Sequence, residues 1–361
     1  MTELRSSAPR RQSKLMPQAR AKELLGTGVG NWEEFASALR CSIAFLFLIA
    51  LPGFVRAQTS SLPQSPQDEY TIHVDVNIVV LRATAQDRTG VLVSGLNQDN
   101  FQIYEDGVLQ EIKFLSREDI PVTVGLVVDN SGSMMPKRDD VIAAALAFAR
   151  SSNPKDQMFV VKFNEKVSFG LPDNLPFTDQ VAQLQVALSR SAPSGETALY
   201  DAVVAAMEHL KKGVRDKKVL IVISDGGDNA SKHKLTEITA LAGQPDAIIY
   251  TIGIFDELDG DRNPGVLKRL AKDTGGETFL PQSLKEIVPI CEQIAHDIRN
   301  QYTLAYFPTN RKRDGAYRVI QVKASAPGRG RLSVRTRTGY FAPVGPQPLP
   351  AAKATDDEAH N

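Results

Sequence analysis

The sequence predicts a doubly wound, mostly parallel α/β sheet placed between two segments that together form an antiparallel β-sandwich. Apolar runs alternate with helical patterns over residues 120–300, which is typical of strands covered by helices on both faces. Residues 70–119 and 301–341 alternate polar and apolar side chains with a period near two, as half-buried strands do. With 361 residues, of which 42% are hydrophobic and 23% charged, the chain can form two globular domains.

The middle segment holds apolar runs and helical patterns in alternation. Each run is apolar on both faces, so we expect buried parallel strands joined by helical crossovers. The expected strands are 121–128, 158–163, 219–224 and 247–254. The expected helices are 137–151, 179–190, 197–212, 232–242, 264–273 and 283–299. Together these elements predict one doubly wound domain over residues 120–300.

The two flanking segments hold short strands separated by turn signals. In 70–119, IHVDVNIVVLRATAQD precedes FQIYEDGVLQEIKFL, where Asp106-Gly107 between β-rich runs predicts a hairpin. In 301–341, the runs QYTLAYF, AYRVIQVKA and RLSVRTRTGYF are separated by glycine-containing turns. Because so few strands are marginally stable alone, we expect the two segments to pair across the middle domain into one sandwich.

The second flanking segment is also rich in basic residues. Nine Lys and Arg residues and one acidic residue, Asp314, lie between Arg311 and Arg337. On strands, such a pattern predicts a solvated face that protects a sheet edge from pairing with other chains. An anionic surface, such as a polysaccharide or lipid headgroups, is the alternative.

The first 57 residues predict a secretory signal peptide with a long leading region. Fifteen uncharged residues lie between Arg40 and Arg56, which as a helix covers about 22 Å, short of the roughly 30 Å of a bilayer core. The run ends in Val-Arg-Ala, so we expect cleavage after Ala57, a secreted or periplasmic location, and no stable membrane span in the mature chain. An uncleaved membrane anchor is the alternative. Residues 58–69 predict a linker, and residues 342–361 predict a disordered tail.

Composition excludes several classes of function. The 42 basic and 42 acidic residues balance, so there is no reason to expect a nucleic-acid partner. Two cysteines, Cys41 and Cys291, are too few for a disulfide scaffold, an iron–sulfur cluster or a cysteine-rich zinc site. The five histidines are scattered, so a histidine-based metal site is not expected.

Oxygen-bearing side chains follow the ends of the predicted strands. Asp-x-Ser-x-Ser follows the first buried strand, Gly-x-Thr opens the third helix, and Ser-Asp-Gly follows the third strand. In such folds the carboxyl ends of the strands meet at one edge, so we expect these side chains to converge. Carboxylate and hydroxyl oxygens suit a hard cation such as Mg²⁺, Mn²⁺ or Ca²⁺ rather than Zn²⁺. The candidate ligands are Asp129, Ser131, Ser133, Thr197 and Asp225.

Each motif alone is an ordinary turn or helix cap, but their order along the chain is more specific. In this order the sequence resembles the von Willebrand factor A domain family, whose fold is Rossmann-like and carries a metal-ion-dependent adhesion site. The resemblance covers residues 121–300 and implies that Ser131, Ser133 and Thr197 coordinate the metal directly. It implies that Asp129 and Asp225 act directly or through water. The flanks LVSGLNQDNFQIYEDGVLQEIKFL and YTLAYFPTN resemble a secreted subgroup best known from Acidobacteria.

These residues predict a binding module rather than an enzyme. Weakly held oxygens leave a cation electrophilic, so a protein partner's Asp or Glu carboxylate can complete its coordination, as the resemblance implies. A structural or assembly protein of the envelope with a vestigial metal site is one alternative. A Mg²⁺-dependent phosphatase with Asp129 as nucleophile is another, but it needs a second Asp where Ser131 stands. The sequence also lacks the dinucleotide-binding glycine motif and the Gly-x-Ser-x-Gly elbow.

Overall fold

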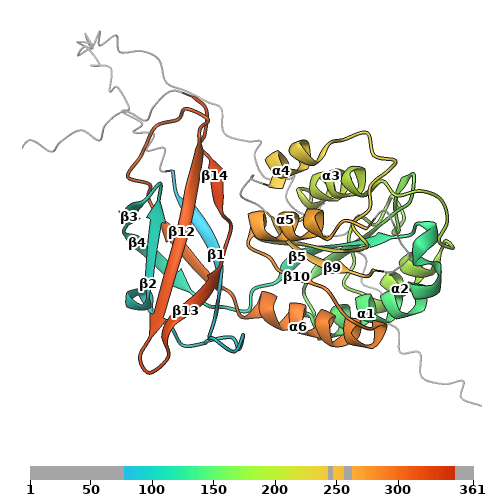
Figure 1. Ribbon diagram of the computed structural model, residues 1–361, viewed down its shortest axis with the longest axis horizontal. Helices are drawn as coiled ribbons and strands as arrows, with labels where there is room; N and C mark the ends of the chain where they lie inside the picture. The colour runs from blue at the N-terminus through green and yellow to red at the C-terminus, as the bar shows by residue number, and fades with distance from the viewer. Residues whose placement is uncertain (1–76, 243–246, 256–261, 346–361) are drawn as a thin grey trace, which may run out of the picture. The chain divides into compact units, whose positions relative to one another are not determined.

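The computed structural model describes residues 77–242, 247–255 and 262–345 (Figure 1). The predicted signal segment 1–57, the linker 58–69 and most of the predicted tail lie outside the described residues. Among the described helices, none combines the length and the apolar composition needed to span a bilayer.

A six-stranded sheet forms the centre of the α/β domain, which we define as Val122–Arg299. Its strand order is β10-β9-β8-β5-β6-β7, and all neighbours are parallel except β7, which is antiparallel to β6. The mostly parallel sheet predicted from the sequence is therefore present. The strands are β5 (Val122–Asp129), β6 (Gln157–Phe163), β7 (Val167–Phe169), β8 (Lys217–Ser224), β9 (Ala247–Gly253) and β10 (Thr278–Phe279).

Helices cover both faces of this sheet, as Figure 1 shows. Helices α1, α2 and α6 lie on one face, and α3, α4 and α5 lie on the other. All six helices were expected, and the largest difference is at α6, whose predicted first turn is a separate 3₁₀ turn, Leu284–Glu286. The helices are α1 (Arg138–Ser151), α2 (Val181–Ser189), α3 (Leu199–Leu210), α4 (Leu235–Ala242), α5 (Pro264–Thr274) and α6 (Ile287–Arg299).

Strand β5 is the centre of the core, and every one of its residues is buried. At Gly125 an added Cβ would lie 2.5 Å from side-chain atoms of both Leu220 and Phe159, so only glycine lets these side chains close over the strand. Burying a Val or Leu side chain contributes about 1.5–3 kcal/mol, and β5, β6 and β8 each bury several such side chains. The sheet is thus a rigid base for the loops at its carboxyl edge.

Both flanking segments share one antiparallel sheet, which we call the β domain. Its strand order is β3-β2-β12-β13-β1-β11-β4, with β14 beside β12. Strand β1 pairs with β11 through its first half and with β13 through its second half, so segments far apart in sequence lie side by side. The strands are β1 (Val79–Gln86), β2 (Phe101–Glu105), β3 (Val108–Gln110), β4 (Ile112–Ser116), β11 (Tyr302–Tyr306), β12 (Tyr317–Ala326), β13 (Gly330–Arg335) and β14 (Gly339–Phe341).

The expected β-sandwich is not seen. The hydrogen-bonded path runs through one continuous, nearly barrel-like sheet instead of two packed sheets. The physical reason is that β1 pairs with both β11 and β13, so the N-terminal and C-terminal strands belong to the same hydrogen-bonded sheet. One apolar core, including Leu81, Ile103 and Leu304, fills the concave side.

The predicted hairpin is present between β2 and β3. Asp106 and Gly107 have φ angles of 47° and 81°, as the two central residues of a type I′ turn require. The Asp106 carboxylate also accepts a hydrogen bond of 2.8 Å from the backbone N–H of Val319, which ties the turn to β12.

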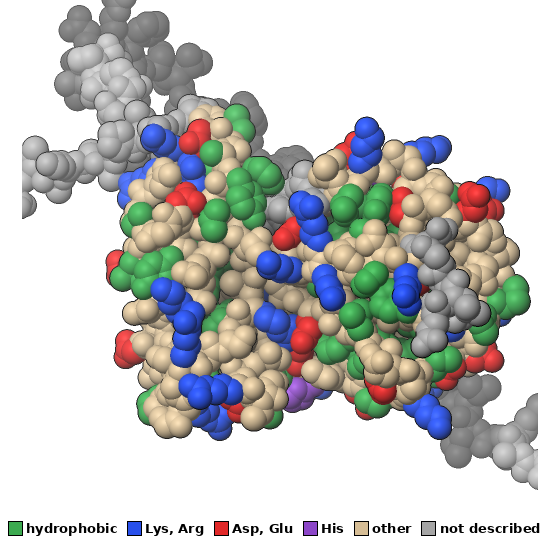
Figure 2. Space-filling model, viewed as in Figure 1, with side chains coloured by type: hydrophobic (Ala, Val, Ile, Leu, Met, Phe, Trp, Pro, Cys, Tyr) green, Lys and Arg blue, Asp and Glu red, His purple; other side chains and the backbone are tan. Residues whose placement is uncertain are grey.

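The basic stretch is only partly the solvated face that was expected. Lys and Arg side chains do gather on the face formed by β12 and β13 (Figure 2). However, Arg318 is buried and ion-pairs with Asp314, and Arg335 ion-pairs with Asp297 and Glu277 of the α/β domain. The expectation of disorder from residue 342 is also wrong at its start, because the Ala342 N–H donates to the Ala316 carbonyl.

Candidate metal centre

Asp129 ends β5 and is anchored by two hydrogen bonds. Its Oδ1 accepts from the backbone N–H of Ser131 at 2.9 Å, and its Oδ2 accepts from the Ser224 hydroxyl at 2.6 Å. Ser224 ends the neighbouring parallel strand β8, so strand pairing itself brings these side chains together. Both carboxylate oxygens of Asp129 are therefore held in place by the protein.

Two hydroxyls and a second carboxylate lie beside Asp129. The Ser131 and Ser133 Oγ atoms are 3.2 Å apart, and the Ser133 hydroxyl donates to Oδ2 of Asp225 at 2.9 Å. Asp225 is the first residue after β8, and Ser133 lies in the 3₁₀ turn that follows β5. The structure thus brings together four of the five residues that the sequence singled out.

The fifth residue, Thr197, is placed by its backbone. The Ser194 N–H donates to the Asn130 carbonyl, and the Gly132 N–H donates to the Gly195 carbonyl, so the 193–197 loop lies against the loop after β5. Asn229 accepts from the Thr197 N–H at 2.8 Å, which joins this loop to the one after β8. The N-cap of α3 is Ala198, and the N–H groups of Tyr200 and Asp201 in its first turn donate to the side chains of Asp228 and Ser231, so helix capping does not account for Thr197.

The site concentrates negative charge in a buried place. The pKa of Asp129 is raised to about 6, because burial and, to a smaller extent, the Asp225 carboxylate together outweigh the lowering effect of the hydrogen bonds from Ser131 and Ser224. A cation between the two carboxylates would reverse this penalty, because an opposite charge favours the ionised form.

The donor set and its spacing fit a small divalent cation. Mg²⁺ binds oxygen ligands at about 2.1 Å with octahedral geometry, so adjacent ligands lie about 3.0 Å apart. The Ser131, Ser133 and Asp225 oxygens are separated by 3.2 and 2.9 Å. In the part of the chain that the structure describes, no three His, Cys, Asp or Glu side chains are placed so that they could hold a metal ion together, so a metal site here depends on hydroxyl ligands.

Two residues of this site were missed by the sequence reasoning. Ser224 is fully buried and holds Asp129, and Asn229 holds the backbone of Thr197. Ser224 stands directly before Asp225, so its position at the end of a buried strand was the signal for it. No local sequence pattern predicts the role of Asn229, because the residue whose N–H it accepts from, Thr197, lies 32 residues away in the sequence.

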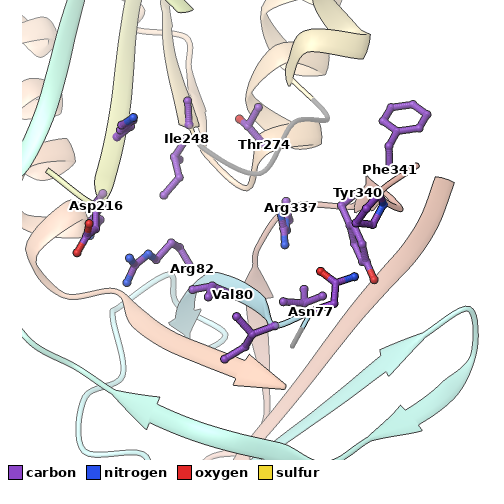
Figure 3. Close-up of a pocket in the computed structure, with 15 residues that line it drawn as sticks. Asn77, Val80, Arg82, Asp216, Ile248, Thr274, Arg337, Tyr340 and Phe341 are labelled. Atoms are coloured by element: carbon purple, nitrogen blue, oxygen red, sulfur yellow. The ribbon is translucent and has the colours of Figure 1, made fainter. Parts of the chain in front are cut away.

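A separate cavity of about 400 Å³ lies at the opposite edge of the α/β sheet (Figure 3). Asp216 and Ile248 line it at the amino ends of β8 and β9, and Arg82 and Tyr340 line it from the β domain. Because Asp129 and Asp225 stand at the carboxyl ends of their strands, this cavity is not part of the candidate metal centre.

Comparison with known proteins agrees with this geometry. Residues 124–227, which include all five candidate ligands, match the family model described as the von Willebrand factor type A domain. This match supports a protein of the von Willebrand factor A family. No curated protein matches the chain.

Several solved structures of low sequence identity are similar to the chain. A von Willebrand factor type A protein from Catenulispora acidiphila is 13% identical, with 75% of each chain covered and a TM-score of 0.46. The vWF domain of the type V pili tip protein Mfa5 from Porphyromonas gingivalis is 15% identical over 50% of this chain and 95% of its own, with a TM-score of 0.42. Proximal thread matrix protein 1 from the mussel byssus, solved with a zinc-occupied MIDAS motif, is 16% identical over 54% of this chain and 50% of its own, with a TM-score of 0.44.

Proposed function

We propose that this chain is a divalent-metal-dependent protein-binding module and not an enzyme. The observation that supports the proposal most is the spacing of the Ser131, Ser133 and Asp225 oxygens, which suits neighbouring ligands of one small cation. Thr197 would complete the set from the adjoining loop, and Asp129 would hold Ser131 and balance charge. Mg²⁺ is the proposed ion, with Mn²⁺ and Ca²⁺ as substitutes.

The partner is proposed to be a protein that presents an Asp or Glu carboxylate. Two hydroxyls are neutral ligands, and Asp129 uses both its oxygens in hydrogen bonds within the protein. A bound cation at this site would supply a Lewis-acidic position that an anionic group can occupy. The chain's own residues fix that position at the sheet edge, where β5 and β8 end.

The hydrogen bonds of Asp129 also argue against the phosphatase alternative. A nucleophilic carboxylate needs a free oxygen that can approach phosphorus, whereas each oxygen here accepts a bond within the protein. The residue two positions on is Ser131, which cannot serve as a general acid at neutral pH. For location, we propose a secreted or periplasmic protein on the basis of the predicted signal segment.

The coordination proposal can be tested with Mn²⁺ and two small probes that differ only in charge. We expect Mn²⁺ bound to the full chain to enhance water proton relaxation, and excess acetate to lower the enhancement by replacing metal-bound water. Acetamide should leave the enhancement unchanged, because it is neutral and a weaker ligand. Equal effects of acetate and acetamide would contradict carboxylate recognition. Phosphate release from p-nitrophenyl phosphate that is lost in Asp129→Asn would favour the enzyme instead.

A further inference from the structure

Three basic side chains gather at the carboxyl end of β6, on the face covered by α1 and α2. Lys162 lies in β6, Arg138 is the first residue of α1, and Arg190 follows the last residue of α2. Burial lowers the pKa of Lys162, and the positive charges of Arg138 and Arg190 lower it further. Among the residues that the structure describes, no Asp or Glu forms an ion pair with any of the three. The cluster therefore carries uncompensated positive charge.

Lys162 makes this cluster unusual because its side chain is inside the protein. The residue is 5% exposed, and its Nζ donates a hydrogen bond of 2.8 Å to the hydroxyl of Ser191, the one acceptor described for it. An ammonium group has three N–H donors, and burying it beside two guanidinium groups is costly without an anion.

The C-terminal end of α2 compensates only part of this charge. Arg138 donates to the Ser189 carbonyl at 2.6 Å, at the last residue of that helix. A helix C-terminus is equivalent to about half a negative charge, whereas the cluster holds three positive charges. An excess of about two and a half positive charges remains after this correction.

A small cavity gives an anion access to the buried ammonium. The cavity measures about 10 Å³, and Lys162, Arg138 and Leu188 are among the residues that line it. This volume has room for about one water-sized atom group, so a single oxygen could enter. Arg190 and Ser191 are exposed at the surface, and the Nε of Arg138 is buried without a hydrogen-bond partner.

We propose that Lys162, Arg138, Arg190 and the Ser191 hydroxyl form a binding site for a doubly charged tetrahedral oxyanion, a phosphate or sulfate group. The charge of such a group offsets most of the excess on the cluster, and guanidinium groups bind its oxygens in pairs. Asp129 and Asn130 also line the small cavity, so the site adjoins the candidate metal centre. The two proposed sites share no ligand residue, so each can be tested separately.

The test is a titration of the full chain with inorganic phosphate in metal-free buffer at constant ionic strength, read by melting temperature and calorimetry. We expect millimolar phosphate to raise the melting temperature of the wild type, and Lys162→Met to weaken phosphate binding at least tenfold. Without phosphate, Lys162→Met should melt at or above the wild-type temperature, because a buried repulsion has been removed. Lys155→Met is the matched control, since Lys155 precedes the same strand at its amino end and is exposed.

The control also separates binding from the general stabilisation that phosphate and sulfate give to proteins. Equal melting shifts in the wild type, Lys162→Met and Lys155→Met would overturn the proposal. Asp129→Asn should keep the full rise in melting temperature with phosphate. The experiment therefore distinguishes a failure of the proposed metal site from a failure of the proposed anion site. If a sugar phosphate monoester binds as tightly as inorganic phosphate, the site takes an esterified group on a larger ligand. If only the inorganic ion binds, the site takes the free ion.

Discussion

Deleting residues 301–361 is expected to abolish amide-exchange protection throughout 79–116 while the α/β domain stays folded. The deletion removes β11 and β13, the two partners of β1, as well as β12 beside β2. Only the β2–β3 hairpin would keep its pairing, and an isolated hairpin is marginally stable in water. The α/β sheet loses none of its own strands.

Hydrogen exchange followed by mass spectrometry measures this directly, peptide by peptide. The comparison of interest is between peptides of β1 and peptides of β5 in the same truncated protein. If 79–116 kept the protection that it has in the full chain, the N-terminal strands would fold without their C-terminal partners. That result would contradict the single sheet.

Replacing Arg335 is expected to be the most destabilising single change on the surface between the two domains. The Arg335 guanidinium lies 2.9 Å from Asp297 and 2.8 Å from Glu277, and the Asp297 side chain is 2% exposed. Arg335→Met leaves the Asp297 charge buried and uncompensated, which costs about 3–5 kcal/mol. Urea unfolding should show the loss, and Arg331→Met, on the same strand but exposed, should cost little.

The effect has a pH signature that a packing defect would not show. Burial raises the pKa of Asp297, and Arg335 opposes that shift, so the pKa should rise further in Arg335→Met. A carboxyl with a raised pKa destabilises the fold above that pKa, and the penalty disappears as pH falls toward the unfolded value of about 3.9. Arg335→Met should therefore recover stability relative to wild type on acidification. Adding Asp297→Asn should give the same recovery at neutral pH, and no recovery in either case would contradict a buried-charge cause.

Elements with strong local patterns could be predicted from the sequence. The four apolar runs became β5, β6, β8 and β9, and the Asp106-Gly107 pair formed the expected hairpin turn. Strands β7 and β10 are three and two residues long, too short for any periodicity to show. The order of the flanking strands depends on pairings across more than 200 residues, such as Ala83 with Tyr302, and no local pattern encodes those.

The same distinction holds for the functional residues. Asp129, Ser131, Ser133 and Asp225 follow strands whose ends are recognisable, so their convergence could be inferred. Arg335 and Arg318 looked like solvated charges, because a sequence shows a charge but not its distant partner. Lys162 lay within an apolar strand pattern, and its significance depends on Arg138 and Arg190 coming from two other elements.

The central claim is that the loops after β5 and β8 hold a divalent cation. The most direct test compares the melting temperature of the wild type and Asp129→Asn in metal-free buffer and with Mg²⁺ or Mn²⁺. Asn keeps the shape of Asp129 and an acceptor for the Ser131 N–H but removes the charge.

At a metal concentration a hundredfold above the dissociation constant, binding should stabilise the wild type by about 2.7 kcal/mol. Asp129→Asn should gain almost nothing and should be at least as stable as the wild type without metal, since burial and Asp225 both disfavour the Asp129 charge. Equal stabilisation of both proteins by the metal would contradict the site.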